Sequence, residues 1–313
     1  MLDLEPAEEH LAVAELSRSV GLELLFPAAR EAQALRAVPA RVWRAVLDTG
    51  LTVPVPEERG GPGVPDTLTQ MIAVENLAYG DPGIALAAAW SGAAALVLAR
   101  HGSAEQEDLL WALLSDPDAR GSVALFEGFG RGASGLRTTV GVEADGTVVV
   151  RGDKVAVPFI DEGVWLVVVG MDPHHGGLRA AVVPRDTPGL QVGPRSGVLA
   201  LEATGAGSVS FDVRLPSGAL LGGPDADPQG LASTIERVRL LTAAVQIGTA
   251  QRAIDYAAAY AVDRVAFGKP IAGFQSVSFP LAEAQIRIEE LRLELGEIAA
   301  SSSTTLRPSC RWR

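Results

Sequence analysis

Residues 264–275, with the sequence RVAFGKPIAGFQ, separate two helical runs near the end of the chain. Before this stretch, residues of high helix propensity run from Ile235 to Asp263 without a proline and with a glycine only at Gly248. After it, apolar residues recur at alternating spacings of three and four, which places them on one face of a second helix: Leu281, Ala284, Ile288, Leu291, Leu295 and Ile298. The stretch is therefore predicted to connect two antiparallel helices of a bundle.

This connector can be explained without any ligand. Arg264 in the last turn of a helix suits the helix dipole, Gly268 ends the helix, and Pro270 prevents the helix from resuming. Any helical hairpin could use these residues. The pattern by itself leaves a purely structural role open.

The order of residue types in the stretch, Arg-x-x-Phe-Gly-x-x-Ile-x-x-Phe-Gln, resembles the signature of the acyl-CoA dehydrogenase family. The resemblance implies that the arginine, phenylalanine and glutamine contact the adenosine pyrophosphate of an FAD held mainly by a neighbouring subunit. A guanidinium is a fixed-charge fork for phosphate oxygens, and an aromatic face and an amide suit the rest of a dinucleotide. The cofactor-binding residues expected here are Arg264, Phe267, Gly268, Phe274 and Gln275.

Composition limits the classes of partner. The chain has 313 residues, enough for two or three packed units, and its 48% hydrophobic content implies a large core or a large subunit interface. A net charge of −12 argues against nucleic acid or an anionic membrane as partner. The single Cys310 excludes an internal disulfide and offers no metal cluster.

No segment of the sequence is predicted to cross a membrane or to direct export. The most apolar window, Ile84–Ala99, is short and dominated by alanine, so we expect a buried core helix there. The N-terminus lacks the positive start and apolar run of a signal peptide. A cytoplasmic localisation is the default expectation.

The chain is predicted to fold as an α+β protein of three units. Residues 1–115 have a helical pattern, residues 116–224 form short valine-rich strands, and residues 225–300 carry the helical hairpin. The resemblance to the family spans Phe26 to Ala300, and it implies an N-terminal helical domain, a middle β-barrel and a shortened C-terminal helical bundle. Residues 301–313 are predicted to be a disordered polar tail, after which a full-length family member has two further long helices.

The family builds its flavin cradle from two middle-domain motifs, typically Thr-Glu-x-x-x-Gly-Ser-Asp and Trp-x-Thr/Ser-Asn, and this chain departs from both. At the first motif, Phe126 and Arg131 replace the residues that carry hydroxyls. At the second, Ala156 or its neighbour stands where the indole is expected, and Pro158 occupies the hydroxyl position without an N–H to offer. The flavin half of the site is therefore predicted to be degenerate.

The family also needs a carboxylate base to remove the α-proton of the acyl thioester. In most members this base lies in the late helices, beyond the end of this chain. Other members carry it in the helix that here contains Glu236, but the equivalent position falls on Val238. We expect Glu236 to be a solvated first-turn carboxylate after an N-cap at Ser233 or Thr234, so no catalytic residue is assigned.

Two separate motif residues and two adjacent histidines in the middle unit receive no functional role. Glu127 stands at the glutamate of the first motif, and Lys154 ends a match to the family's Gly-x-Lys. The adjacent His174 and His175 point apart and have no third ligand nearby, so we expect a surface turn and no metal.

The adenosine side of an FAD site is thus retained while its flavin cradle and base are missing. The resemblance implies a subunit of a heteromeric acyl-CoA dehydrogenase, as in short bacterial members of steroid breakdown that form α2β2 heterotetramers with a complete paralogue. The partner would supply cradle, base and acyl-CoA pocket and pass electrons to an acceptor, and the isolated chain would be inactive. Two alternatives stay open: a homomeric enzyme seen as a truncated chain, and a non-catalytic scaffold without flavin.

Overall fold

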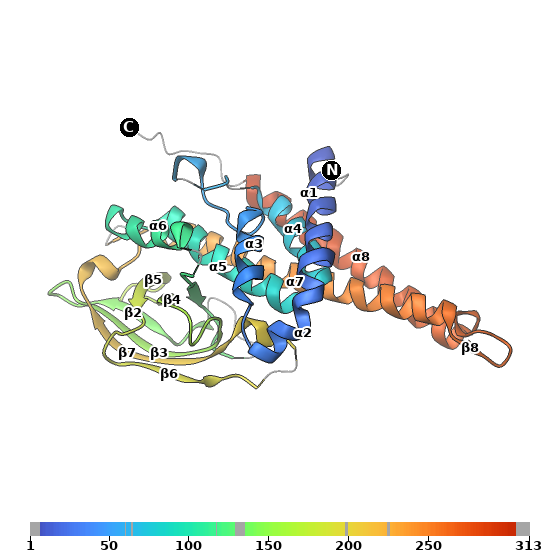
Figure 1. Cartoon of the computed structure of the whole chain (residues 1–313). Helices are drawn as coiled ribbons and strands as arrows, with labels where there is room; N and C mark the ends of the chain where they lie inside the picture. The colour runs from blue at the N-terminus through green and yellow to red at the C-terminus, as the bar shows by residue number, and fades with distance from the viewer. Residues whose placement is uncertain are drawn as a thin grey trace.

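The computed structural model describes residues 7–304 except 60, 64, 117, 129–134, 198–199 and 224–225. A helical unit, a β unit and a long helical hairpin follow one another along the chain (Figure 1). This arrangement confirms the predicted α+β class with its helical, β and helical domains.

The first unit is built around α5 (Pro82–His101), which is rich in alanine and lies at the centre of the molecule (Figure 1). The helix is long and apolar enough to cross a membrane by length and composition, yet 83% of its most apolar window is buried inside the protein. It is the core helix that the sequence predicts. The other helices of the unit are α1 (Glu8–Val20), the π-helical turn η1 (Gly21–Leu25), α2 (Phe26–Leu35), α3 (Ala40–Asp48), α4 (Thr67–Gly80) and α6 (Glu107–Ser115).

The second unit is a strongly curved sheet in the order β1-β4-β2-β3-β7-β6, with β5 paired along the whole length of β4. Most pairs are antiparallel, whereas β1 and β2 run parallel to β4. Among the described residues no ladder joins β6 to β5, so the sheet forms a half-barrel. Its strands are β1 (Gly121–Ala124), β2 (Thr139–Val142), β3 (Val148–Val157), β4 (Trp165–Met171), β5 (Leu178–Pro184), β6 (Leu190–Arg195) and β7 (Gly207–Leu215).

Alternating side chains divide this sheet between two cores. On β4, Val167 packs with α5 and with the later helix α7 (Pro228–Asp263), whereas its neighbours Leu166 and Val168 point into the hollow of the half-barrel. The indole N–H of Trp90 on α5 donates to the carbonyl oxygen of Val123 at 2.9 Å, which ties the helix to β1. The outer face of the sheet is thereby fixed to the helical units.

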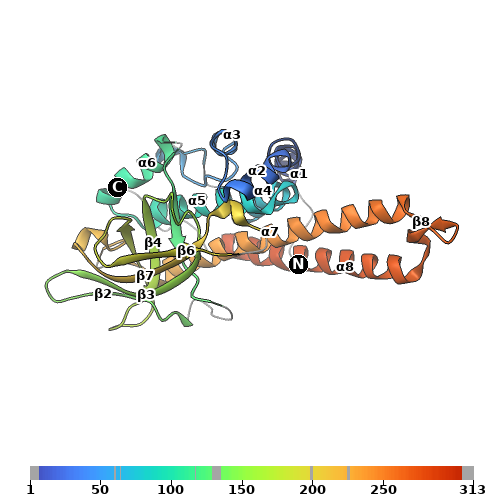
Figure 2. The ribbon, with the colours of Figure 1, turned by 60° about the horizontal axis from the view of Figure 1, so that its bottom comes forward.

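The third unit is the pair α7 (Pro228–Asp263) and α8 (Gln275–Thr304), which projects from the body (Figure 2). Helix α7 crosses α4 closely at Gly248, where an added Cβ would lie 2.0 Å from the carbonyl oxygen of Glu75. Only glycine allows this approach. The glycine in the predicted helix is therefore explained by helix packing and does not interrupt α7.

The connector between these helices differs from the ligand-free prediction. Helix α7 ends at Asp263 with Arg264 extended, so Gly268 does not end the helix. Instead β8 (Val265–Ala266) pairs with β9 (Lys269–Pro270), and the two residues between them have positive φ, 51° at Phe267 and 83° at Gly268. Two successive positive φ values form the tight turn of a small β-hairpin.

Helix α8 departs from its sequence prediction in two respects. Ile288 is buried on the predicted apolar face, but Leu291 and Ile298 are 49% and 50% exposed. The helix also continues to Thr304, four residues into the predicted disordered tail. The rest of that predicted tail, residues 305–313, lies outside the described residues.

Candidate functional site

The five residues predicted to bind a cofactor gather at the free end of the α7–α8 pair, around the β8–β9 hairpin (Figure 2). Phe267 is 95% exposed, and its ring meets the Phe274 ring edge-on at 6.1 Å between centroids. The backbone N–H of Ile271 donates to the carbonyl oxygen of Arg264 at 2.8 Å, which holds the two ends of the connector together. The structure therefore brings the motif together as one exposed patch.

This patch offers the groups that an anionic dinucleotide needs. The guanidinium of Arg264 is exposed and has no hydrogen bond or ion pair with any described residue. Gln275 is the first residue of α8, so its amide stands at the positive end of a helix dipole. Lys269 lies over the Phe274 ring at 4.4 Å and adds a second cation. Free donors, an aromatic face and positive charge thus coincide.

The predicted flavin cradle lies elsewhere, on the half-barrel. Its two segments are neighbours, because the N–H of Val155 donates to the carbonyl oxygen of Phe126 at 2.8 Å. Lys154 reaches across with its ammonium group, donating to the carbonyl oxygen of Leu125 at 3.0 Å and to Oε1 of Glu127 at 2.9 Å. The side chains of this ion pair are 0% and 4% exposed. Two retained motif residues without an assigned role thus form one buried contact.

Glu127 is held as a carboxylate. Burial would raise its pKa, but the backbone N–H of Arg137, the Lys154 ammonium and Thr138 outweigh burial and lower the pKa to about 2. The carboxylate accepts from the N–H groups of Arg137 and Thr138 at 2.7 and 2.9 Å. Glu127 therefore links the segment after β1 to the start of β2 and to β3.

The residues that depart from the family motifs fill space with apolar groups. The Phe126 ring stacks on the Trp90 indole of α5 at 5.6 Å with 26° between the planes. Pro158 is buried, and Ala156 has a positive φ of 53° at a β-bulge. Residues 125–128 and 154–159 contain no side-chain hydroxyl. The described residues of these segments therefore offer few side-chain groups that could form hydrogen bonds with a flavin ring. Arg131 lies outside the described residues.

The two parts of the candidate site are far apart within one chain. Figure 2 shows the β8–β9 hairpin at the free end of the helical pair and the half-barrel at the opposite end of the molecule. The hairpin residues of this chain cannot contact a cofactor that rests on its own half-barrel.

The surroundings of Glu236 agree with a surface role. Its side chain is 58% exposed and pairs with Arg239 at 2.9 Å, whereas Val238 is fully buried. The predicted N-cap at Ser233 or Thr234 is wrong, because α7 begins at Pro228 with Asp227 as its cap. Glu236 consequently lies in the third turn, because the preceding Asp-Pro pair starts the helix earlier.

Arg237 is a buried polar residue to which the sequence assigned no role. Its Nε donates to Oε1 of Gln70 at 2.9 Å, and its Nη2 donates to the carbonyl oxygen of Pro65 at 2.7 Å. Burial lowers its pKa to about 10. The sequence did not reveal the burial of Arg237, because the spacing of residues in a helix does not distinguish a buried arginine from a solvated one.

The two middle-domain histidines form the predicted surface turn. Both are exposed, and Asp172 accepts hydrogen bonds from the backbone N–H groups of His174 and His175 at 2.8 and 3.3 Å. Within the part of the chain that the structure describes, no three His, Cys, Asp or Glu side chains are grouped to hold a metal ion.

Known proteins match the chain along almost all of its length. A model of the acyl-CoA dehydrogenase N-terminal domain matches residues 7–116, and a model of the acyl-CoA dehydrogenase C-terminal domain matches residues 230–308. The mitochondrial short-chain specific acyl-CoA dehydrogenase of Bos taurus is 30% identical over 297 residues, which cover 93% of this chain and 72% of that protein. The chain belongs to the acyl-CoA dehydrogenase family.

Bacterial acyl-CoA dehydrogenases support the same assignment. The probable acyl-CoA dehydrogenase FadE25 of Mycobacterium tuberculosis is 29% identical over 94% of this chain and 76% of its own length. The structure of butyryl-CoA dehydrogenase from Megasphaera elsdenii superposes with a TM-score of 0.80 at 26% identity, covering 97% of this chain and 82% of that one. The acyl-CoA dehydrogenase family consists of oxidoreductases that act on CH–CH bonds, and FAD is typical of its solved structures.

Proposed function

We propose that this chain completes the FAD site of a heteromeric acyl-CoA dehydrogenase. The hairpin tip binds the adenosine pyrophosphate through Arg264, Phe267, Gly268, Phe274 and Gln275. A paralogous subunit in an α2β2 assembly supplies the flavin cradle, the base and the acyl-CoA pocket. The complex oxidises acyl-CoA esters of lipid or steroid catabolism in the cytoplasm and passes electrons to an electron-transfer acceptor.

The position of the hairpin carries this proposal. A pyrophosphate needs charged and polar donors, and Arg264 and Gln275 present them at the end of a projecting arm (Figure 2). Because the arm points away from the chain's own half-barrel, these donors can serve only a cofactor held by another subunit. This geometry supports a site that two subunits share.

The half-barrel favours a paralogue as the partner. In a homo-oligomer, the half-barrel of each chain would have to hold the flavin ring of an FAD whose adenosine pyrophosphate binds to the hairpin of a neighbouring chain. Here Phe126 stacks on Trp90, and Pro158 has no N–H to donate. A partner with hydroxyl-bearing side chains at the positions of Phe126 and Pro158 would therefore bind the flavin ring better than this chain.

Each part of the complex then has a separate role in catalysis. FAD, when bound, accepts the hydride from the β-carbon of the acyl thioester. The residues of this chain do no proton transfer: Arg264 neutralises phosphate charge, Phe267 offers an aromatic face, and Gln275 donates from its amide. Their contribution is to hold and orient the cofactor in the partner's site.

Co-expression with a paralogous acyl-CoA dehydrogenase followed by a flavin-to-subunit ratio tests the proposal. We expect about one FAD per two chains in the complex and neither bound flavin nor acyl-CoA oxidation in the isolated chain. Arg264→Ala should weaken FAD retention by about tenfold or more, since hydrogen bonds to charged groups contribute about 1.5–3 kcal/mol. Arg287→Ala, an exposed arginine further along α8, is the matched control.

Two results would decide for the alternatives. An isolated chain that binds one FAD per subunit and oxidises acyl-CoA is a homomeric enzyme, a possibility favoured by the retained Glu127–Lys154 pair. A complex whose FAD content is unchanged by Arg264→Ala makes this chain a scaffold.

A further inference from the structure

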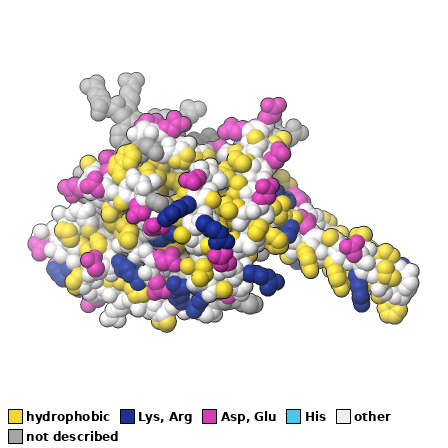
Figure 3. Space-filling model, viewed as in Figure 1, with side chains coloured by type: hydrophobic (Ala, Val, Ile, Leu, Met, Phe, Trp, Pro, Cys, Tyr) yellow, Lys and Arg dark blue, Asp and Glu magenta, His cyan; other side chains and the backbone are white. Residues whose placement is uncertain are grey.

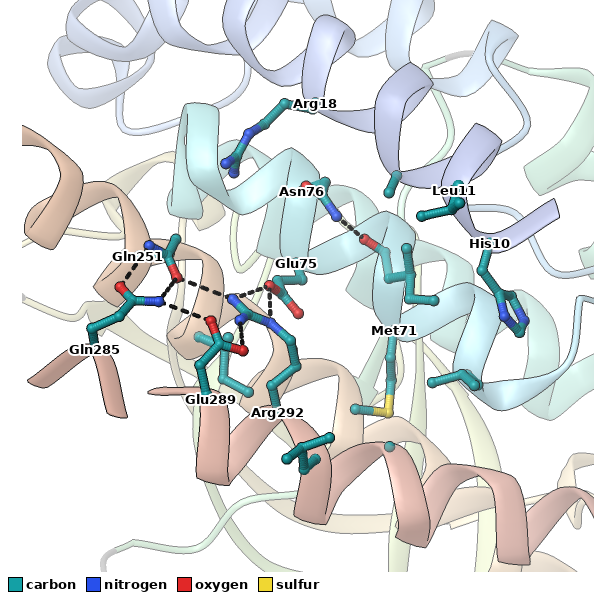
Figure 4. A pocket seen from close by; sticks show the side chains of 16 residues that line it. His10, Leu11, Arg18, Met71, Glu75, Asn76, Gln251, Gln285, Glu289 and Arg292 are labelled. Atoms are coloured by element: carbon teal, nitrogen blue, oxygen red, sulfur yellow. Dashed lines mark hydrogen bonds and ion pairs between the residues drawn. The ribbon is translucent and has the colours of Figure 1, made fainter. Parts of the chain in front are cut away.

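A pocket of about 670 Å³ lies at the base of the projecting hairpin, between α1, α4, α7 and α8 (Figure 4). Its volume is in the range of small-molecule sites. It is far from the hairpin tip and from the half-barrel segments. Much of its wall is apolar: Leu11, Ala14, Leu68, Met71, Ile72, Ile247 and Leu293.

One side of the pocket carries a polar network that satisfies itself. The guanidinium of Arg292 pairs with Glu75 at 2.9 Å and with Glu289 at 2.6 Å, and it donates to Oε1 of Gln251 at 3.2 Å. Gln285 joins the network by donating to Gln251 and Glu289 (Figure 4). This network holds one guanidinium and two carboxylates, so it does not call for an anionic ligand on its own side of the pocket.

A pair of arginines, of which Arg18 lines the pocket and Arg252 does not, is different. The guanidinium carbon of Arg18, a residue of the pocket wall, lies 3.2 Å from the centroid of the Tyr79 ring. The guanidinium carbon of Arg252 lies 5.0 Å from the same centroid and 4.9 Å from that of Phe26. Since both carbons are placed over one ring at these distances, they are at most 8.2 Å apart.

This stack is held in place before any ligand arrives. Tyr79 is buried, and its hydroxyl donates to Oδ2 of Asp255 at 2.8 Å. Asp255 also accepts from Nε2 of Gln251 at 2.9 Å, and it forms no ion pair with either arginine. A pre-organised stack loses little side-chain entropy when it binds a ligand.

Both arginines retain their capacity to bind an anion. Arg18 and Arg252 are half-buried, and neither guanidinium has a hydrogen bond or an ion pair with any residue that the structure describes. Stacking on an aromatic ring uses the flat face of a guanidinium and leaves its N–H donors in the plane. An anionic partner stabilises a partly buried cation. Although the chain is strongly acidic, no described carboxylate pairs with either of these two arginines.

We propose that the pocket binds a single-chain amphiphile with an anionic head. The apolar tail lies along the α1–α4–α8 wall, and a carboxylate or phosphate head accepts hydrogen bonds from Arg18, with Arg252 adding positive charge near the same Tyr79 ring. The two head groups share one chemistry, a delocalised oxyanion that suits the planar guanidinium donors.

Calorimetric titration of the full chain with four ligands of equal tail length tests the chemistry. Decanoate and decyl phosphate should bind, and the tighter of the two identifies the head group. Decanol should bind at least tenfold more weakly, because it lacks the charge. Decyltrimethylammonium binding as tightly as decanoate would overturn the proposal.

Substitutions test the location. Arg18→Gln and Arg252→Gln should each weaken decanoate binding, by about tenfold for Arg18, and leave decanol binding unchanged. Ala14→Trp should weaken both ligands, since it fills the apolar wall. Arg151→Gln, an exposed arginine on β3, removes the same charge elsewhere and should have no effect. Unchanged decanoate affinity in Arg18→Gln, with the thermal transition of the wild type retained, would place the ligand outside this pocket.

Discussion

The buried ion pair between Glu127 and Lys154 is the residue-scale feature on which the half-barrel loop depends. The two side chains are almost inaccessible to water and approach to 2.9 Å. Loss of one partner would leave the other charge buried and unpaired, which costs about 3–5 kcal/mol in comparable cases. The pair should therefore be sensitive to single substitutions and tolerant of joint replacement.

We expect Lys154→Met to lower the free energy of unfolding by about 3–5 kcal/mol. The double variant Glu127→Gln/Lys154→Met should recover part of this loss, because no charge is then buried. Urea denaturation of the four proteins of the cycle gives the coupling energy. A coupling energy near zero would mean that the two charges do not interact in solution.

The same carboxylate predicts an acid sensitivity. The pKa of Glu127 is lowered from 4.5 to about 2. A carboxyl group whose pKa is lower in the folded state stabilises the fold above its unfolded pKa, and this contribution is lost as the pH falls from 4.5 to 2. The free energy of unfolding of the wild type should fall more steeply across this window than that of Glu127→Gln. Parallel curves for the two proteins would contradict the assignment.

Motif matching identified Glu127 and Lys154 as single residues but did not predict the contact between them. Glu127 and Lys154 could be identified in the sequence because each stands at a motif position. Their pairing could not, since it depends on the Val155–Phe126 backbone hydrogen bond that joins two distant segments. The same limit applies to Arg18, Tyr79 and Arg252, whose stack combines three helices.

At the scale of elements, the connector of the helical hairpin shows how one local pattern supports two structures. A glycine followed by a proline is equally suited to a helix stop and to a β-turn. The structure adopts the turn because α7 already ends at Asp263, which leaves a short strand on each side of Phe267 and Gly268. The existence of the first helix was predictable from its helix propensity and that of the second from its apolar spacing, but their ends were not.

Gly248 should be irreplaceable at the α4–α7 crossing. An alanine Cβ would lie 2.0 Å from the Glu75 carbonyl oxygen, and backbone cannot yield as a side chain can. We expect Gly248→Ala to lower the free energy of unfolding by about 1–3 kcal/mol, the usual cost of overpacking.

Gly296→Ala in α8 is the matched control for that substitution. Its added Cβ would meet only the Leu68 side chain at an ordinary 3.9 Å. It should therefore raise the stability by about 0.5–1 kcal/mol through helix propensity. Thermal denaturation compares the two variants, and equal effects of the same sign would refute the close crossing.

At the scale of the whole molecule, the projecting hairpin carries apolar surface that one chain does not cover. Figure 3 shows hydrophobic side chains gathered along the arm, with few charged ones between them. Surfaces of this kind mark sites of protein association. The large exposed apolar side chains of the arm are Tyr256, Tyr260, Val262, Val265, Phe267, Phe279 and Ile286.

Charges placed on this arm should prevent assembly without unfolding the chain. Phe279 and Ile286 are 56% and 58% exposed on α8, so the double variant Phe279→Lys/Ile286→Lys loses little core packing. We expect it to sediment as a smaller species than the wild type. Leu16→Lys, a substitution of a similarly exposed residue on α1, should leave the assembly intact.

The order of helical, β and helical units could be predicted from the sequence, because hydrophobic period and motif order are local properties of the chain. The distance between the hairpin and the half-barrel could not, since no local pattern records where a long helix points. This distance separates the hairpin that carries Arg264 from the half-barrel that carries Phe126 and Pro158 (Figure 2). The motif residues of one chain therefore cannot contact the same cofactor molecule, and a shared cofactor would need two subunits.

The hairpin also works as a lever. From its crossing at Gly248 to its end at Asp263, α7 extends by about 23 Å at 1.5 Å per residue. A tilt of about 5° at the crossing would displace the tip by about 2 Å, more than the tolerance of a hydrogen bond. The proposed cofactor affinity at the tip should therefore depend on how the helices pack at the base. Substitutions around Glu75 and Arg292 should alter flavin retention without touching the cofactor.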